Sequence, residues 1–261
     1  MTHLTEDQLE CWEKNGYLLL KNYFSTDKFP LDQWVTELSN WPETPGKWMK
    51  YFERGANGER QLCRVENFIQ YHDGLNSIIN SPEIIDILST LMQEKAILFK
   101  EKINMKYPGG SGFIAHQDAP AFTTFNQKYH ITMMVSIDKS DKENGCLEVV
   151  KGGYHKKGML PQAEDKTIAP DYEKELHWEA IETEPGDVLF FDSYIPHRSN
   201  KNLSNRSRRA MYITYNKVSE GDYREAYYAD KRKVFPPECE REEGKDYSNA
   251  GVYNVANPIE K

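Results

Sequence analysis

The sequence predicts a mainly β fold, a double-sheet jelly roll with helices packed outside it. From Ala96 onward the apolar pattern changes from helical to extended, and short strand-like runs follow one another. Turn residues separate these runs, as at residues 108–110 (PGG), 144–145 (NG) and 184–187 (EPGD). Many short strands with turn signals, preceded by helical patterns, are typical of this architecture.

The first part of the chain carries helical patterns. Thr5, followed three residues later by Gln8, forms a capping box, and Ser81 before Pro82 marks a second helix start. A short strand is expected at residues 17–20 (YLLL). The three predicted helices cover about residues 6–14, 29–38 and 82–92.

Seven strands are expected after these helices, at residues 96–99, 103–107, 130–137, 146–150, 178–183, 188–192 and 210–216. We expect one domain over residues 1–261, because the chain shows no repeat and no low-complexity linker. Its helical part covers about residues 1–95 and its jelly-roll core about residues 96–220. The tail at 221–261, rich in charge and proline, is the part whose structure the pattern does not predict.

Composition limits the function classes. Hydrophobic residues make up 38% of the 261 and charged residues 28%, as in a soluble globular protein. A net charge of −8 argues against a nucleic-acid partner, because binding to phosphate backbones needs a basic surface. The one short basic run, residues 231–233 (KRK), is followed by acidic residues and is interpreted as solvated surface.

The location expected is the cytoplasm. No apolar run has the length of a membrane span, and the N-terminus lacks the pattern of a signal peptide. The four cysteines are far apart and include no C-x-x-C pair, so they are expected to be free thiols. A small-molecule substrate is expected, with no membrane partner, and the oligomeric state stays open.

The sharpest motif is His116-Gln117-Asp118, an H-x-D pattern in an extended segment. Residues i and i+2 of a strand point to the same side, so His116 and Asp118 can face one ion. His197, after the strand expected at 188–192, supplies a second imidazole. Two histidines and one carboxylate leave metal positions open for a co-substrate and O₂, as in iron(II) oxygenases. H-x-D alone is short enough to occur by chance.

The sequence around the motif resembles the phytanoyl-CoA dioxygenase family of iron(II)- and 2-oxoglutarate-dependent oxygenases. The resemblance rests on the ordered segments 144–155 (NGCLEVVKGGYH), 185–191 (PGDVLFF), 196–199 (PHRS) and 208–210 (RRA). It covers about residues 5–220 and implies a cupin-like, double-stranded β-helix core. It also implies that His116, Asp118 and His197 are the iron ligands, and that iron(II), 2-oxoglutarate and O₂ are used to hydroxylate a substrate. Succinate and CO₂ are then released.

The resemblance implies that Arg208 pairs with the far carboxylate of 2-oxoglutarate. A guanidinium suits this task, because its planar fork bonds a carboxylate through two hydrogen bonds and keeps its charge. Arg206 and Arg209 are neighbouring candidates. Strand alternation would put Arg206 and Arg208 on one face, which makes Arg209 the weaker rival.

Lys100, Lys102 and Asn104 share one face of an expected strand that leads toward the metal motif. Two interpretations stay open, a solvated sheet face or a pocket wall that meets 2-oxoglutarate or an anionic substrate group. The aromatic-rich segment 41–54 is interpreted as a loop, either core cover or a lid over the pocket.

The expected substrate is small and polar or anionic, with an amino-acid- or aminophosphonate-like compound preferred because of the two lysines. Two alternatives differ in class. One is a zinc hydrolase that uses the same three ligands and would need a general base near the metal. The other is a sensor that binds metal or ligand without turnover.

Overall fold

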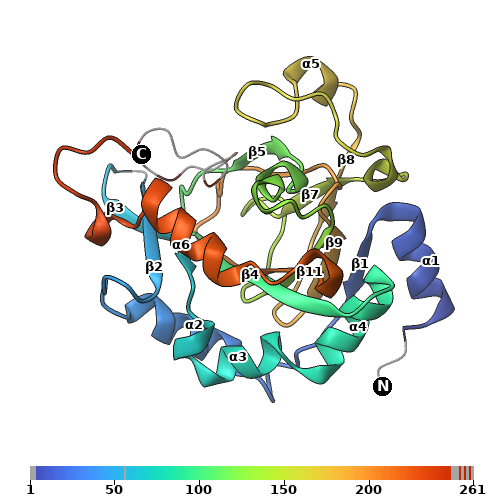
Figure 1. Cartoon of the computed structure of the whole chain (residues 1–261), viewed down its shortest axis with the longest axis horizontal. Coiled ribbons are helices and arrows are strands. Elements are labelled where there is room, and N and C mark those ends of the chain that lie inside the picture. The colour runs from blue at the N-terminus through green and yellow to red at the C-terminus, as the bar shows by residue number, and fades with distance from the viewer. Residues whose placement is uncertain (1–3, 56, 248–252, 254–255, 257–258, 260–261) are drawn as a thin grey trace.

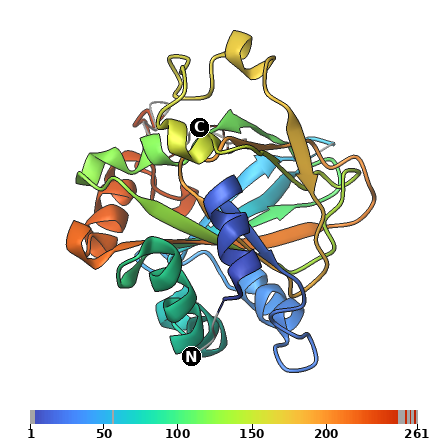
Figure 2. The ribbon, with the colours of Figure 1, turned by 90° about the vertical axis from the view of Figure 1, so that its right-hand side faces the viewer.

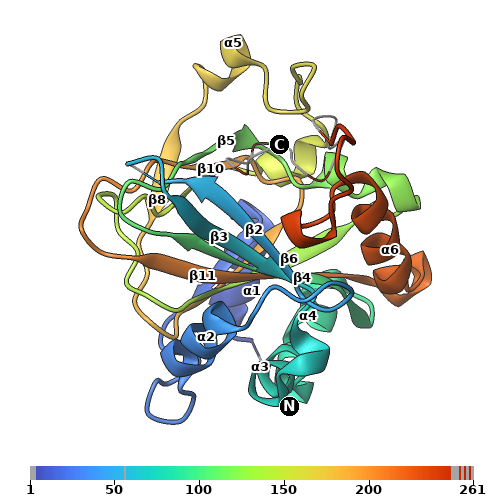
Figure 3. The same cartoon turned by 90° about the vertical axis from the view of Figure 1, so that its left-hand side faces the viewer.

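Two antiparallel β-sheets lie one above the other in the computed structural model, which describes residues 4–55, 57–247, 253, 256 and 259 (Figure 3). The larger sheet has the order β1 (Tyr17–Leu20), β9 (Val188–Asp192), β6 (His130–Ser136), β11 (Arg208–Lys217), β4 (Ala96–Lys106), β3 (Arg60–Glu66) and β2 (Met49–Arg54). The smaller sheet has the order β5 (Phe113–His116), β10 (His197–Ser199), β7 (Leu147–Val150) and β8 (Trp178–Ile181). The predicted jelly roll is confirmed.

Helices cover the outer face of the larger sheet. They are α1 (Glu6–Asn15), α2 (Leu31–Asn40), α3 (Asp73–Ile79) and α4 (Pro82–Met92), with α5 (Pro170–Glu173) and α6 (Arg224–Val234) elsewhere (Figure 1). Leu38 of α2 and Leu88 of α4 share one buried apolar cluster with Ile103 and Met211 of the sheet. The helix α1 lies beside β1 at the sheet edge (Figure 2). Its capping box between Thr5 and Gln8 is present as predicted.

Alternation along β11 decides which side chains face the smaller sheet. Met211 and Ile213 belong to the helix-side cluster, whereas Ala210 and Tyr212 pack with Leu147 of the smaller sheet. Successive side chains of a strand point to opposite faces. Arg208, at the first position of β11, therefore lies on the face between the sheets.

The two strands expected at 96–99 and 103–107 are one continuous strand, β4 (Ala96–Lys106). Lys100 and Lys102 interrupt the apolar pattern but not the strand, which pairs with β11 along its length. Lys100 and Lys102 therefore lie on a strand that forms a polar wall of a pocket, and no turn interrupts the strand there.

The interpretation of residues 41–54 as a loop is wrong for residues 49–54, whereas residues 41–48 contain no helix or strand. Met49–Arg54 forms β2, which pairs with β3 and extends the larger sheet. Tyr51 is buried, and its hydroxyl donates a hydrogen bond to the carbonyl of Phe235, 2.8 Å away. The Tyr51 ring stacks on Phe235 of the C-terminal segment, whereas Trp41 and Trp48 pack against the helix-side apolar cluster. The geometry therefore supports the interpretation of these aromatic residues as core cover.

The C-terminal tail contains a structured helix, α6, that packs against β4 (Figure 1). The buried Glu101 of β4 fixes it through ion pairs with Arg224 and a hydrogen bond from the Tyr228 hydroxyl. Within the described residues, no helix combines the length and apolar character that a bilayer crossing requires.

Candidate metal centre

Strand pairing brings the two predicted histidine ligands together. β5 and β10 are antiparallel neighbours in which His116 is paired with His197, and the ring centroids are 4.2 Å apart. Asp118 follows β5 directly, and its Oδ1 lies 3.7 Å from Nε2 of each histidine. One potential ligand atom from each of the three residues lies within 4.8 Å of the other two. The chain thus forms the three-residue cluster that the sequence predicted.

Both histidines are oriented by their own backbone. Nδ1 of His116 lies 2.7 Å from the carbonyl oxygen of Ile114, and Nδ1 of His197 lies 3.0 Å from that of Ile195. A carbonyl oxygen only accepts, so each Nδ1 carries the hydrogen and each Nε2 keeps a free lone pair. This arrangement directs both Nε2 atoms toward Asp118 and suits metal binding.

Charge and burial give the cluster the protonation states that a metal needs. Burial and the neighbouring His197 lower the pKa of His116 to about 3, so its ring is neutral near pH 7. Burial opposes ionisation of Asp118, but His197 and Lys102 outweigh it and hold the pKa of that carboxyl below its usual range. Two imidazole nitrogens and one carboxylate form the donor set preferred by non-haem iron(II).

The pocket around the cluster has two lobes that share Lys100, Lys102, Phe113, His116 and Asp118. The first, here the strand lobe, is also lined by Asn104, Thr132, Leu147, His197, Arg198, Ser199, Tyr212 and Thr214. The second, here the helix lobe, is also lined by Arg64, Glu66, Gln117, Ala121, Tyr227, Lys231 and Tyr253. The interpretation of Lys100, Lys102 and Asn104 as pocket residues is the one that the geometry supports.

Arg208 lies behind the strand lobe. Its Nη2 donates to the Tyr212 hydroxyl at 2.9 Å and its Nε to Ser140 Oγ at 3.3 Å, and only 1% of the residue is exposed. Among the described residues none of its hydrogen bonds or ion pairs goes to a carboxylate. Lys102 lies over the ring of the same tyrosine, 5.6 Å from its centroid.

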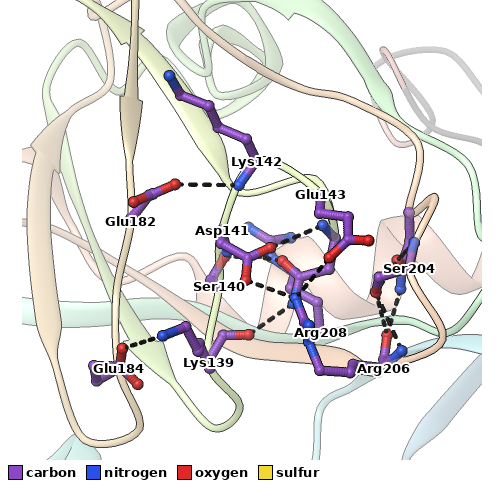
Figure 4. A network of polar contacts seen from close by, with 12 residues as sticks. Lys139, Ser140, Asp141, Lys142, Glu143, Glu182, Glu184, Ser204, Arg206 and Arg208 are labelled. Atoms are coloured by element: carbon purple, nitrogen blue, oxygen red, sulfur yellow. Dashed lines mark hydrogen bonds and ion pairs between the residues drawn. The ribbon is translucent and has the colours of Figure 1, made fainter.

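Arg206, the neighbouring candidate, forms ion pairs with two carboxylates that do not line either lobe. Its Nη2 bonds Asp141 at 2.6 Å and Glu143 at 3.3 Å, and 47% of its side chain is exposed (Figure 4). Arg206 lies in the turn before β11, so strand alternation does not align it with Arg208. Arg209, on the opposite face, pairs with Asp138 and Asp32.

The helix lobe is rich in positive charge. Lys231 of α6 is 1% exposed and places Nζ 2.7 Å from both oxygens of Glu66. Arg64 reaches the same carboxylate at 3.4 Å and donates through Nε to Asn104 Oδ1 at 3.0 Å. Lys100 Nζ lies 3.5 Å from the Tyr227 hydroxyl and 4.7 Å from the centroid of the Phe122 ring.

Sequence analysis anticipated Lys100 but missed Arg64, Glu66, Tyr227 and Lys231. Lys231 belongs to the basic run that was interpreted as solvated surface, and that interpretation is wrong for this residue. Two local signals were present. Arg64 and Glu66 are two positions apart on one strand face, and Tyr227 and Lys231 are four apart on one helix face.

The family model of phytanoyl-CoA dioxygenase matches residues 12–210. The 2-aminoethylphosphonate dioxygenase of an uncultured bacterium is 53% identical over 262 residues, which cover 99% of this chain and 100% of that protein. The methylphosphonate hydroxylase of Gimesia maris is 43% identical, over 90% of this chain and 89% of its own.

A solved structure has the same fold. The crystal structure of EctD from S. alaskensis, with 2-oxoglutarate and 5-hydroxyectoine, superposes with a TM-score of 0.70 at 18% identity. The match covers 83% of this chain and 77% of that one. The chain therefore belongs to the phytanoyl-CoA dioxygenase family, and the class expected from the sequence, an iron(II)- and 2-oxoglutarate-dependent oxygenase, is confirmed.

Proposed function

We propose that this protein hydroxylates a small organophosphonate of the 2-aminoethylphosphonate type, with 2-oxoglutarate and O₂ as co-substrates. The observation that carries the proposal is the charge of the pocket beside the three-residue cluster. Among the described residues that line the helix lobe, four side chains are cationic, Arg64, Lys100, Lys102 and Lys231, and two are carboxylates, Glu66 and Asp118. The relatives named for phosphonate substrates support the same substrate class.

In the proposed site, Nε2 of His116, Nε2 of His197 and a carboxylate oxygen of Asp118 hold iron(II). Bound iron and 2-oxoglutarate would supply the oxidising chemistry, in which O₂ is consumed, succinate and CO₂ leave, and a hydroxyl is placed on the substrate. The protein contributes a fixed ligand geometry and a largely buried pocket.

Arg208 is proposed to bind the far carboxylate of 2-oxoglutarate. A buried guanidinium without a carboxylate partner is costly, so an anion is expected beside it. The strand lobe extends from the cluster to Tyr212, whose hydroxyl accepts a hydrogen bond from Arg208. The Tyr212 hydroxyl is then placed to donate to the same carboxylate. Lys102, above the Tyr212 ring, adds positive charge on this side.

The zinc hydrolase alternative is not favoured by the pocket. Apart from Asp118, the described residues that line the two lobes include one carboxylate, Glu66. Both oxygens of Glu66 are bonded by Lys231, and a carboxylate held in this way is a poor general base. The cytoplasm is the proposed location, in keeping with the four cysteines, none of which forms a disulfide.

The test is anaerobic reconstitution with iron(II) and 2-oxoglutarate, followed by a library of small substrates assayed for O₂-dependent succinate release. The library contains 2-aminoethylphosphonate, methylphosphonate, and amino acids that carry no phosphorus. Phosphorus NMR of the product locates the new hydroxyl. Succinate release only with compounds that lack phosphonate would overturn the proposed substrate class.

A further inference from the structure

We propose that the helix lobe is the binding subsite for the doubly charged phosphonate group, and that Lys231 of α6 is its specificity-determining residue. The inference rests on the proposed function and assigns its substrate contact to one residue. It separates the two anions of the reaction, because 2-oxoglutarate would occupy the strand lobe and the phosphonate the helix lobe.

The first argument is charge. Three lysines, Lys100, Lys102 and Lys231, line the helix lobe, and among its described residues Glu66 is the one carboxylate outside the metal cluster. Asp118, the other carboxylate of the lobe, belongs to the metal cluster. Taking cations from water into a protein interior is costly unless anions accompany them. A group with two negative charges compensates more of this excess than a carboxylate does.

The second argument is that Lys231 is held rigidly. The helix α6 that carries it is tied to β4 by Arg224, whose guanidinium bonds the fully buried Glu101. At the other end of the helix, the Tyr51 hydroxyl bonds the carbonyl of Phe235. A cation already positioned before its ligand arrives loses little entropy on binding, which favours selectivity as well as affinity.

The third argument is where these residues lie in the chain. The family model ends at residue 210, whereas Tyr227, Lys231 and Tyr253 all come later. The strand lobe is therefore built mostly from the shared core, and the helix lobe is completed by a segment outside the match. A family that acts on varied substrates is expected to place the contacts that distinguish them outside its common core.

Burial lowers the pKa of Lys231 to about 8, although Glu66 opposes this change. The amine is still charged at neutral pH, so it can pair with an anion. A strongly desolvated charge gains more from that pairing than an exposed one.

The experiment compares two ligands, 2-aminoethylphosphonate and its monomethyl ester, which has one negative charge fewer. Their dissociation constants are measured anaerobically on the iron(II) and 2-oxoglutarate form of the full chain at neutral pH. The variants are Lys231→Met and, as matched control, Lys233→Met, an exposed lysine on the same helix. The double variant Lys231→Met with Glu66→Leu leaves no unpaired buried carboxylate and guards against misfolding of the single variant.

Lys231→Met should weaken phosphonate binding on the order of 100-fold, because a buried charged contact is lost. Ester binding should weaken by less than about tenfold, as for one weaker hydrogen bond. The double variant should show the same pattern as the single Lys231 variant. Lys233→Met should bind both ligands as the wild type does. The dissociation constant for 2-oxoglutarate should be unchanged in all variants. Equal loss for both ligands, or unchanged phosphonate affinity in both Lys231 variants, would overturn the role of Lys231 while the proposed function stands. A wild-type protein that binds no phosphonate would overturn both.

Discussion

The two lobes of the pocket share a metal cluster but are built in different ways. The strand lobe is lined by β4, β6, β10 and β11, and its buried cation, Arg208, has only hydroxyl partners among the described residues. The helix lobe is lined by β3, α6 and Tyr253, and its cations already hold a carboxylate, Glu66. We propose the first as the site of the shared co-substrate, 2-oxoglutarate. The second, as the proposed substrate subsite, can change its specificity through its own charged residues.

The largest effect should come from the cluster that both lobes share. Asp118→Ala removes one of three ligands and should abolish succinate formation and lower iron occupancy. Asp118→Gly should lose activity as well. The control is His177→Ala, an exposed histidine that should keep full activity and iron content. Iron analysis and succinate release would measure this, and wild-type turnover in purified Asp118→Ala would contradict the ligand assignment.

The next largest effect should be a loss of 2-oxoglutarate affinity when the strand lobe is altered. Arg208→Ala should keep iron but lose roughly two to nearly four decades in affinity for 2-oxoglutarate, since losing one buried charged partner costs about 3–5 kcal/mol. Arg208→Lys should recover part of the loss, because a point charge lacks the planar fork. Arg206→Ala serves as control, because Arg206 is engaged by Asp141 and Glu143 (Figure 4).

Anaerobic titration of 2-oxoglutarate into the iron(II) forms measures these affinities. A dissociation constant unchanged in Arg208→Ala would reject the co-substrate site proposed for the strand lobe.

A smaller effect should show which lobe each of Lys100 and Lys102 serves. Lys102 lies over Tyr212, whereas Lys100 lies near Tyr227 and Phe122. Lys102→Met should raise the apparent KM for 2-oxoglutarate about tenfold, and Lys100→Met should do so for the phosphonate, as expected for one charged hydrogen bond. Steady-state kinetics with each substrate varied in turn tests this. The reverse pattern would exchange the roles of the two lysines, and wild-type kinetics in both variants would remove them from binding.

The smallest effect should be a pH dependence confined to the helix lobe. The pKa of Lys231 is lowered to about 8 by burial, so the amine is charged below that pH and neutral above it. Burial also lowers the pKa of Lys100. Raising the pH through about 8 should therefore lower kcat/KM for the phosphonate, by about tenfold per pH unit for a single essential cation.

Lys231→Arg should move this fall to higher pH, because a guanidinium stays charged. A profile of kcat/KM against pH in both proteins is the measurement. A wild-type profile that stays flat well above pH 8 would show that Lys231 carries no charge needed for binding.

The metal cluster was predictable from sequence because its signal is local. His116 and Asp118 are two positions apart, and His197 and Arg208 stand in segments whose order the family shares. The helix lobe was not predictable in this way. Glu66 and Lys231 are 165 positions apart, and only the fold shows that they form an ion pair. Lys231 belongs to the basic run at residues 231–233, and such a run is normally interpreted as exposed unless a buried partner is known.

The fold too was predictable only where its sequence signals are local. Strands with continuous apolar runs, such as β6 and β9, were found, whereas β2 and β3 carry charged residues and were missed. The buried Glu66 of β3 pairs with Lys231 of the C-terminal segment, and such a contact is visible only in the fold. Helix α6 was missed for the same reason, because its contacts are ion pairs with strands far away in the chain.

The backbone hydrogen bonds of the two histidines have a consequence for how this enzyme can change. Each Nδ1 is held by a carbonyl two residues earlier, at Ile114 and Ile195. No side-chain replacement deletes a carbonyl oxygen, so the orientation of both rings is insulated from substitutions elsewhere in the pocket. If the helix lobe is the substrate subsite proposed above, its residues can change substrate specificity while the two histidine rings keep their orientation.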